Sequence, residues 1–103
     1  MDNIANTAEK SKHTPAEPLP LIVGHTYEAK RKAQAGVIDP LWNDRMIVWI
    51  GVAEVQYDSP TVAIGRRLPK VSHEQFRRWA ARDITSEMPN GEWRSARPTG
   101  ATP

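Results

Sequence analysis

Histidines are the residues of this 103-residue chain that most directly suggest metal binding or proton transfer. There are three, and the second and third, His25 and His73, have neither another histidine nor a carboxylate at the i,i+4 spacing of a helical metal site. His13 lies in an N-terminal stretch with few apolar residues. Ser72 precedes His73, but adjacent residues at a helix start point apart. The sequence therefore predicts no catalytic residue, no metal site and no cofactor.

Carboxylates offer a second possible chemistry, since paired acids perform general acid–base catalysis. The candidates Asp39, Asp44 and Asp58 each flank a proline, asparagine or serine. Aspartate in such contexts usually stabilises the turn itself. We expect Asp83 to lie on a helix and to pair with a basic residue or a tryptophan indole.

Basic side chains form the strongest pattern. Between positions 65 and 82 there are six Lys and Arg residues against Glu74, a local charge of +5 in a chain whose net charge is +2. These six are Arg66, Arg67, Lys70, Arg77, Arg78 and Arg82. Such asymmetry is typical of polyanion binding, so we predict that the six contact nucleic acid. The alternative is a solvated face whose arginine stems cover apolar neighbours.

Composition excludes several classes of protein. Without cysteine the chain has no disulfide, no thiolate nucleophile and no cysteine-based zinc site. No charged leader precedes an apolar run, and no apolar run reaches the roughly 18 residues of a membrane span. We therefore expect a cytoplasmic protein that does not bind membranes.

One helix carries the basic pattern, and we predict it over residues 71–84. Ser72 and Gln75 have the spacing of a capping box. Phe76, Trp79 and Ile84 then share one face at helical periodicity, and the arginines fall on the opposite face. Glu74 and Arg78 are spaced for an i,i+4 ion pair.

Strands are expected before this helix. Residues 25–31 alternate polar and apolar, as in a half-buried strand, and residues 45–50 are apolar after Arg45, as in a central strand. Further short strands are predicted at 55–58 and 61–64. Residues 33–44 are rich in turn formers and are predicted to form a long loop.

These elements predict an α+β fold in which four to five short antiparallel strands form a sheet or small barrel with one C-terminal helix. The domain is expected over residues 21–94, between a disordered leader at 1–20 and a disordered tail at 95–103. A homodimer that shares an edge strand is compatible with this arrangement. The expected core is Val48, Ile50, Tyr57, Val62, Ile64, Phe76 and Trp79.

A resemblance adds to this interpretation. It rests on Val55-Gln-Tyr-Asp58, Gly65-Arg66-Arg67, Val71-Ser72, Phe76 and Trp79-Ala80. This pattern is similar to that of small uncharacterised proteins of phages and proteobacterial mobile elements, some of which resemble Src-homology-3-like β-barrels. The resemblance covers roughly residues 24–84. It implies a compact barrel with a helical end and transfers no catalytic residue.

Two functional hypotheses from different classes follow. The first is a non-enzymatic module that binds nucleic acid weakly and with little sequence preference through its basic edge and helix. The second is a protein-interaction module that binds or inhibits a host complex, with Trp42 and Trp93 as anchors. Salt dependence distinguishes them, because phosphate contacts weaken steeply with salt.

Overall fold

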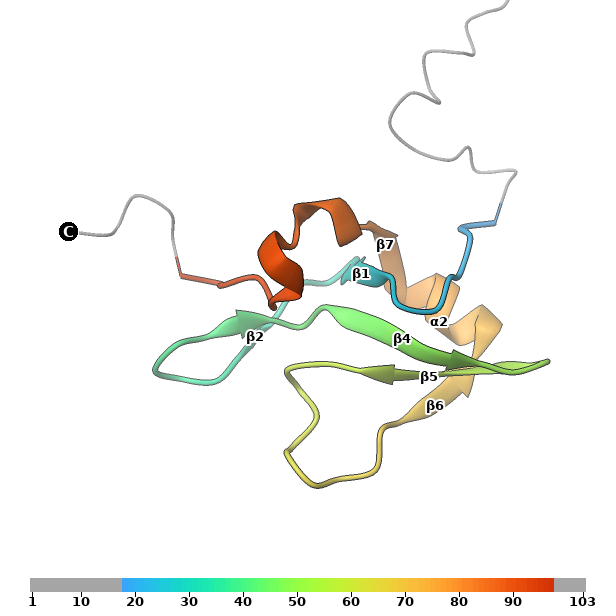
Figure 1. The fold of residues 1–103 in the computed structure, drawn as a ribbon, viewed down its shortest axis with the longest axis horizontal. Helices are drawn as coiled ribbons and strands as arrows, with labels where there is room; N and C mark the ends of the chain where they lie inside the picture. Colours follow the sequence, from blue (N-terminus) through green and yellow to red (C-terminus); the bar gives the residue numbers. More distant parts are fainter. Residues whose placement is uncertain (1–17, 98–103) are drawn as a thin grey trace, which may run out of the picture.

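The computed structural model describes residues 18–97, which form a curled five-stranded antiparallel sheet, one short helix and a separate two-stranded hairpin (Figure 1). The main sheet has the order β6–β5–β4–β1–β7. Its strands are β1 (Thr26–Ala29), β4 (Arg45–Ile50), β5 (Glu54–Asp58), β6 (Lys70–Ser72) and β7 (Ala80–Asp83). The helix is α2 (His73–Trp79), and the hairpin consists of β2 (Gln34–Ala35) and β3 (Leu41–Trp42). The predicted α+β class and small antiparallel sheet are confirmed.

Strands β4 and β5 form the middle of the sheet and make its most extensive pairing. Ile47 lies opposite Tyr57, and both point to the inner face together with Val55. The register shifts between Ile47 and Trp49, which places Trp49 opposite Gln56 on the outer face. Such a bulge re-aims side chains relative to a regular pleat. The predicted central strand is thus confirmed, but only its inner face is fully covered.

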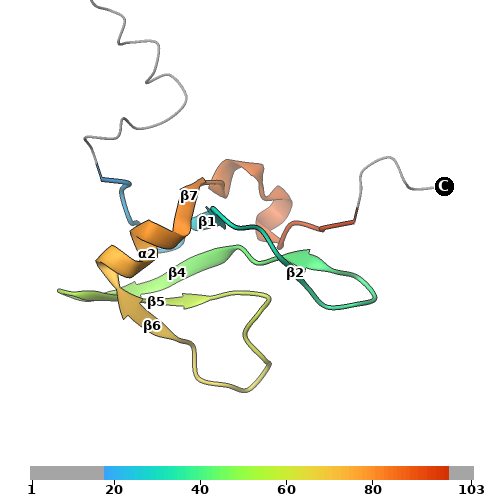
Figure 2. The same cartoon turned by 180° about the vertical axis from the view of Figure 1, so that it is seen from behind.

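Helix α2 connects the two edge strands β6 and β7 directly, so it lies across the open side of the curled sheet (Figure 2). The predicted capping box is present: Gln75 N donates to Ser72 Oγ at 3.0 Å, and Ser72 N donates to Gln75 Oε1 at 3.0 Å. At seven residues, α2 is too short to be stable alone. Its stability must come from Phe76, which is completely buried against the sheet.

An aromatic cluster fills the space between helix and sheet. The centroid of the Phe76 ring lies 5.4 Å from that of Tyr27, with the two ring planes nearly perpendicular. Its centroid distances to Tyr57 and Trp79 are 6.0 and 5.3 Å. Edge-to-face geometry of this kind adds to the free energy of area burial. The hydroxyl of Tyr27 donates to the carbonyl of Pro20 at 2.8 Å, which satisfies the polar end of a buried ring.

The helix ends earlier than the sequence predicts. Ala80 has extended φ and ψ angles, and the following residues form β7, which pairs with β1. Ile84 is buried beside β1 rather than on a helical face, and Arg82 and Asp83 lie on or at the end of a strand. The helix is therefore internal to the fold, not C-terminal. Pairing with the edge of β1 outweighs the helix propensity of these residues.

Two further expectations about strands are wrong. Residues 61–64 form turns and no strand, so Ile64 is fully exposed and Val62 only half-buried, instead of both lying in the core. The edge position is taken by β6 instead. The strand β1 is buried on both faces rather than half-buried. Tyr27 faces the core cluster, and Glu28 on the opposite face is covered by its ion pairs with Lys32, Arg82 and Arg94.

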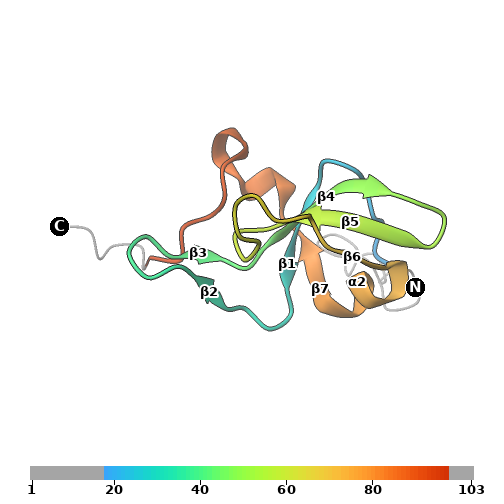
Figure 3. The same ribbon diagram turned by 90° about the horizontal axis from the view of Figure 1, so that it is seen from below.

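The predicted long loop at 33–44 contains the hairpin β2–β3, which projects from one end of the molecule while the β4–β5 turn extends from the other (Figure 3). After β7 the chain forms two 3-10 turns, Thr85–Glu87 and Pro89–Gly91, and then returns to this hairpin. Leu41 forms an antiparallel bridge with Ser95, and Ala96 N donates to the Pro40 carbonyl at 2.8 Å.

Leu19 and Ala96, which the sequence places in the tails, are both buried in the described structure. Leu19 belongs to the main core cluster. The packed part of the chain is therefore wider than residues 21–94. The predicted disorder of residues 1–17 and 98–103 falls outside the described residues.

Candidate nucleic-acid interface

Three of the predicted nucleic-acid-binding residues lie close together at one edge of the sheet. Arg66 and Arg67 are on the loop that joins β5 to β6, and Lys70 is the first residue of β6. All three side chains are exposed. We call Arg66, Arg67 and Lys70 the basic cluster.

The loop that carries the cluster is fixed at both ends. At its start, Ser59 is buried, accepts a hydrogen bond from Val62 N at 3.0 Å, and donates its own amide to the Asp58 carboxylate at 2.8 Å. At its end, the side-chain amide of Gln56 donates to the Leu68 carbonyl at 3.0 Å. Pro69 provides no backbone donor, in keeping with its place beside an edge strand.

The positive charge of the basic cluster is not compensated by ion pairs within residues 18–97. Residues 59–73 contain no Asp or Glu. Among the ion pairs formed within residues 18–97, none involves the three cations of the cluster. Because no carboxylate competes for these groups, they are available to an external anion.

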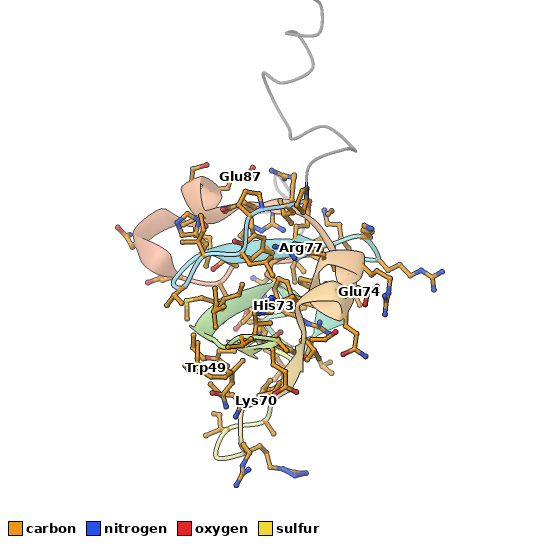
Figure 4. The ribbon with its side chains drawn as sticks, turned by 90° about the vertical axis from the view of Figure 1, so that its right-hand side faces the viewer. Trp49, Lys70, His73, Glu74, Arg77 and Glu87 are labelled. Carbon is orange, nitrogen blue, oxygen red and sulfur yellow. The ribbon has the colours of Figure 1, made fainter. Side chains whose placement is uncertain are left out.

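The two helix arginines lie in different environments. Arg78 is exposed and pairs with Glu74 at 3.2 Å, which confirms the predicted i,i+4 pair. Since both partners are exposed, the pair contributes little to stability. Arg77 is half-buried, and its Nε donates to the Leu19 carbonyl at 2.9 Å. Figure 4 shows Arg77 and Lys70 at separate levels of the molecule, with His73 between them.

Arg82 lies apart from the basic cluster, on β7 at the opposite edge of the sheet. It donates to Glu28 at 2.9 Å and also pairs with Glu87. Glu87 raises the pKa of the Arg82 guanidinium, which keeps the group charged. The single basic helix face that the sequence predicts is therefore not formed: the helix ends before Arg82, which faces acidic partners instead.

These partners belong to a partly buried acid–base network that the sequence did not reveal. Arg94 donates through Nε to Asp44 Oδ2 at 2.9 Å and through Nη2 to Asp44 Oδ1 at 3.0 Å. Its Nη2 also reaches Glu28 at 3.2 Å. Asp44 is only 1% exposed, so it is a buried ion-pair partner and not the turn stabiliser that was expected. Lys32 also belongs to this network, because its ammonium forms an ion pair with Glu28 at 3.2 Å.

The network alters the protonation of its members. Burial alone would raise the pKa of Glu28, but hydrogen bonds from Lys32 and Arg94 outweigh it and hold the pKa below its ordinary value. The hydrogen bond to Asp44 is the main reason that the pKa of Arg94 is raised. Both groups are therefore held in their charged forms at neutral pH.

The two tryptophans proposed as partner anchors lie on neighbouring segments. Trp42 on β3 is half-buried, its backbone amide donates to the Arg94 carbonyl at 3.2 Å, and the Lys32 ammonium lies 4.8 Å from its ring. Trp93 is also half-buried and immediately precedes Arg94. The fold thus brings together two residues that are distant in sequence.

Two histidines of the described chain have structural partners. His25 Nδ1 lies 2.6 Å from Asp83 Oδ2, and His73 Nε2 lies 2.9 Å from the Gly51 carbonyl. Burial acts to raise the pKa of Asp83, but the hydrogen bonds from His25 and Thr85 lower it below its ordinary value. The expectation that Asp83 pairs with a basic residue holds, although the pairing is made from a strand. Residues 18–97 contain no cluster of three potential metal ligands.

Two side chains of β4 are further candidates for ligand contact, and neither was identified from the sequence. Trp49 is 44% exposed on the outer face of β4. Arg45, at the start of the same strand, is held between the rings of Tyr57 and Trp79, at 4.3 and 4.1 Å from their centroids. Burial lowers the pKa of Arg45, and the two ring faces provide its cation–π contacts.

Comparison with known proteins assigns no family. No protein family, curated protein or solved structure matches the chain. Within the described residues, no helix has the length and apolar character needed to cross a bilayer.

Proposed function

We propose that this protein is a small non-enzymatic module that binds nucleic acid weakly and with little sequence preference through the basic cluster. The observation that supports the proposal is the separation of charge within the fold. Arg82 and Arg94 are engaged by acidic partners, whereas Arg66, Arg67 and Lys70 are exposed without such partners in residues 18–97. Exposed, uncompensated cations on one edge are the electrostatic basis of non-specific phosphate binding.

The chemistry of the cluster favours phosphate contact over base reading. Arginine and lysine reach phosphates readily, but sequence readout also requires amide or carboxylate groups aimed at base edges. Gln56, the register partner of Lys70, has an amide side chain, and one of its two N–H groups is already bonded to the Leu68 carbonyl. We therefore propose binding that tolerates many sequences.

We also propose a more specific fold type for the sheet. A strand order in which the first strand β1 lies between β4 and the last strand β7, with a helix just before β7, is compatible with a Src-homology-3-like small barrel. We propose this relationship together with a phage or mobile-element origin and a cytoplasmic location. A homodimer through the edge of β6 is less favoured, because Pro69 and Lys70 are residues that discourage edge pairing.

The experiment compares two variants with the same change of charge at different places. Arg66→Glu/Arg67→Glu alters the basic cluster, and Lys30→Glu/Arg31→Glu alters exposed cations that follow β1. Labelled duplex and single-stranded oligonucleotides are titrated between about 50 and 200 mM salt. Three phosphate contacts predict a slope of about −2 to −3 when the logarithm of the binding constant is plotted against the logarithm of the salt concentration. In the Arg66/Arg67 variant the magnitude of this slope should fall by about two.

The outcomes separate the hypotheses. Loss of binding in the Arg66/Arg67 variant, with a smaller effect in the Lys30/Arg31 variant, supports the proposal. Equal loss in both variants would mean that net charge alone is responsible. No binding by the wild type at low salt would remove the nucleic-acid function. Arg77→Glu would be a poorer test, because the Arg77 Nε also donates to the Leu19 carbonyl and its loss would disturb the fold.

A second candidate is a protein-interaction module, and a separate surface favours it. Val37 and Ile38 at the tip of the β2–β3 hairpin are almost fully exposed. The base of this hairpin carries Trp42 with Trp93 on the adjacent segment. Exposed aliphatic residues and tryptophans on one projecting element are typical contact anchors for a host protein. Capture of a partner that is lost in Val37→Ser/Ile38→Ser and insensitive to nuclease would support this alternative.

A further inference from the structure

Trp49 lies on the outer face of the sheet in line with the basic cluster. Its register partner is Gln56, and the register partner of Gln56 is Lys70, so the three residues form one row across β4, β5 and β6. Gln56 lies between the inward-facing Val55 and Tyr57, which fixes the row on the opposite, outer face. Trp49 and Lys70 accordingly appear next to one another in Figure 4.

The indole of Trp49 is the most exposed aromatic side chain in residues 18–97, and one side of it lies against the backbone of Gly51. A Cβ atom added to Gly51 would come within 2.3 Å of the far edge of the ring, so the ring lies directly over the glycine backbone. With the indole in this orientation, a residue with a Cβ atom at position 51 would clash with the ring. The six-membered part of the indole is thereby supported from one side, while 44% of the residue remains accessible.

On the side of β6, this ring is bordered by positive charge. The Lys70 ammonium lies 4.9 Å from the ring centroid. Arg66 and Arg67 lie on the loop that leads into Lys70, and that loop contains no acidic residue. An aromatic platform bordered by unpaired cations is the combination by which proteins bind single-stranded nucleic acid, since a base stacks on the ring and phosphates meet the cations.

We propose that Trp49 is a stacking platform for one unpaired base, and that the module therefore prefers single-stranded nucleic acid to duplex. The inference rests on the proposed nucleic-acid function and specifies its ligand. The incoming base takes the position of the Lys70 ammonium over the indole, and Lys70 turns to the adjacent phosphate. A base in a duplex has both faces covered by its neighbours, so only a single strand presents a free face to Trp49.

Charge complementarity selects this occupant over an apolar protein surface. A protein segment docking on Trp49 would bring Lys70 and the two loop arginines into its interface, where their desolvation is unfavourable without acidic partners. A phosphate backbone supplies such partners at every nucleotide. DNA and RNA single strands share this chemistry, so both belong in the test.

The test measures the affinity of the full chain for fluorescent strands of about 15 nucleotides at about 50 mM salt, a length within the usual range of such sites. The probes are oligothymidylate, oligouridylate, a duplex of equal length and an abasic DNA strand. The variants are Trp49→Leu, and Trp49→Phe as the conservative control that keeps a ring. Trp49→Leu should weaken single-strand binding roughly 5- to 150-fold, the loss expected for one stacked base.

Four results are expected if the inference is correct. The wild type binds single strands more tightly than duplex. Trp49→Leu removes this preference but changes duplex affinity less than about twofold. Trp49→Phe keeps most of the preference for single strands. The abasic strand binds wild type and Trp49→Leu equally, because it has no base to stack. An unchanged thermal midpoint shows that Trp49→Leu is folded.

Other results overturn the inference and are distinguishable from one another. If wild type and Trp49→Leu bind single strands equally, while Arg66→Glu/Arg67→Glu still weakens binding, stacking is wrong and the proposed function stands. If Trp49→Leu weakens binding to the abasic strand as much as to oligothymidylate, its effect is not stacking. If the wild type binds none of the probes, the proposed function and this inference fail together.

Discussion

Arg94 is the residue whose replacement most directly tests the acid–base network. Its guanidinium holds Asp44 through two hydrogen bonds and Glu28 through a third. Arg94→Met keeps a long side chain but leaves the Asp44 carboxylate, which is 1% exposed, without its ion-pair partner. Removing one partner of a buried pair typically costs about 3 to 5 kcal/mol, because the remaining charge stays desolvated.

The matched control is three residues away. Arg97 also forms an ion pair, with Asp39, but both members of this pair are exposed. Arg97→Met should therefore cost less than about 1 kcal/mol. A folded part of this size has a stability of about 4 to 12 kcal/mol, so the Arg94 variant should be severely weakened. At a slope of about 1.5 kcal/mol per M urea, its midpoint should fall by roughly 2 to 3 M.

The pH dependence supplies an independent check. Glu28 has a lowered pKa in the folded state, so the stability it contributes is fully present above its unfolded pKa of about 4.3 and is lost as pH falls through the folded value. Because Arg94 is one cause of that shift, Arg94→Met should reduce the loss of stability on acidification. Urea titrations by circular dichroism at pH 7 and below pH 4 measure both effects. Equal midpoints for the two arginine variants at pH 7 would refute the network as a stabilising element.

Two further predictions concern the fold. Ser72→Ala should lower the free energy of unfolding by about 1 kcal/mol through loss of the capping hydrogen bond to Gln75 N, and a urea midpoint equal to that of the wild type would contradict the role of the cap. Ile84→Ala should cost about 2 to 5 kcal/mol because Ile84 is completely buried, whereas Ile64→Ala should change stability by less than about 0.5 kcal/mol because Ile64 is fully exposed. Similar midpoints for the two isoleucine variants would mean that the burial pattern is wrong.

Features with local causes were predictable from the sequence. The capping box depends on two side chains three residues apart, and its spacing is visible in the chain. The strand over residues 45–50 was predictable because its last four residues, 47–50, are all β-branched or aromatic and favour an extended conformation. The class of the fold followed from such elements together with the turn residues between them.

Features with non-local causes were not predictable. Residues 80–84 continue a helical pattern locally, but β1 offers a free edge, and the Glu28–Arg82 hydrogen bond forms only between paired strands. Nothing in the local sequence indicates that edge. In the same way Asp44 and Arg94 are fifty positions apart, so their ion pair carries no sequence signal, and a turn was the reasonable prediction for Asp44.

The candidate site was predictable only in part for the same reason. The sequence identified the basic residues but assumed that one helix would align them, and the early end of α2 removes Arg82 from the set. Trp49 was not identified because it lies in an unbroken apolar run, where periodicity does not reveal which residues face outward. Only the register shift in β4 places its ring on the outer face.

The arrangement of charge makes stability and binding separable. Glu28, Asp44 and Arg94 stabilise the β1–β7 side of the sheet, whereas the basic cluster and Trp49 lie toward β6. Buried ion pairs are little screened by salt, but phosphate contacts at exposed cations are strongly weakened by it. Raising the salt concentration should therefore abolish binding at concentrations that leave the unfolding midpoint almost unchanged. Parallel loss of both properties would mean that the loop carrying Arg66 and Arg67 is a structural element of the sheet, and the division of roles inferred from the ion pairs would be wrong.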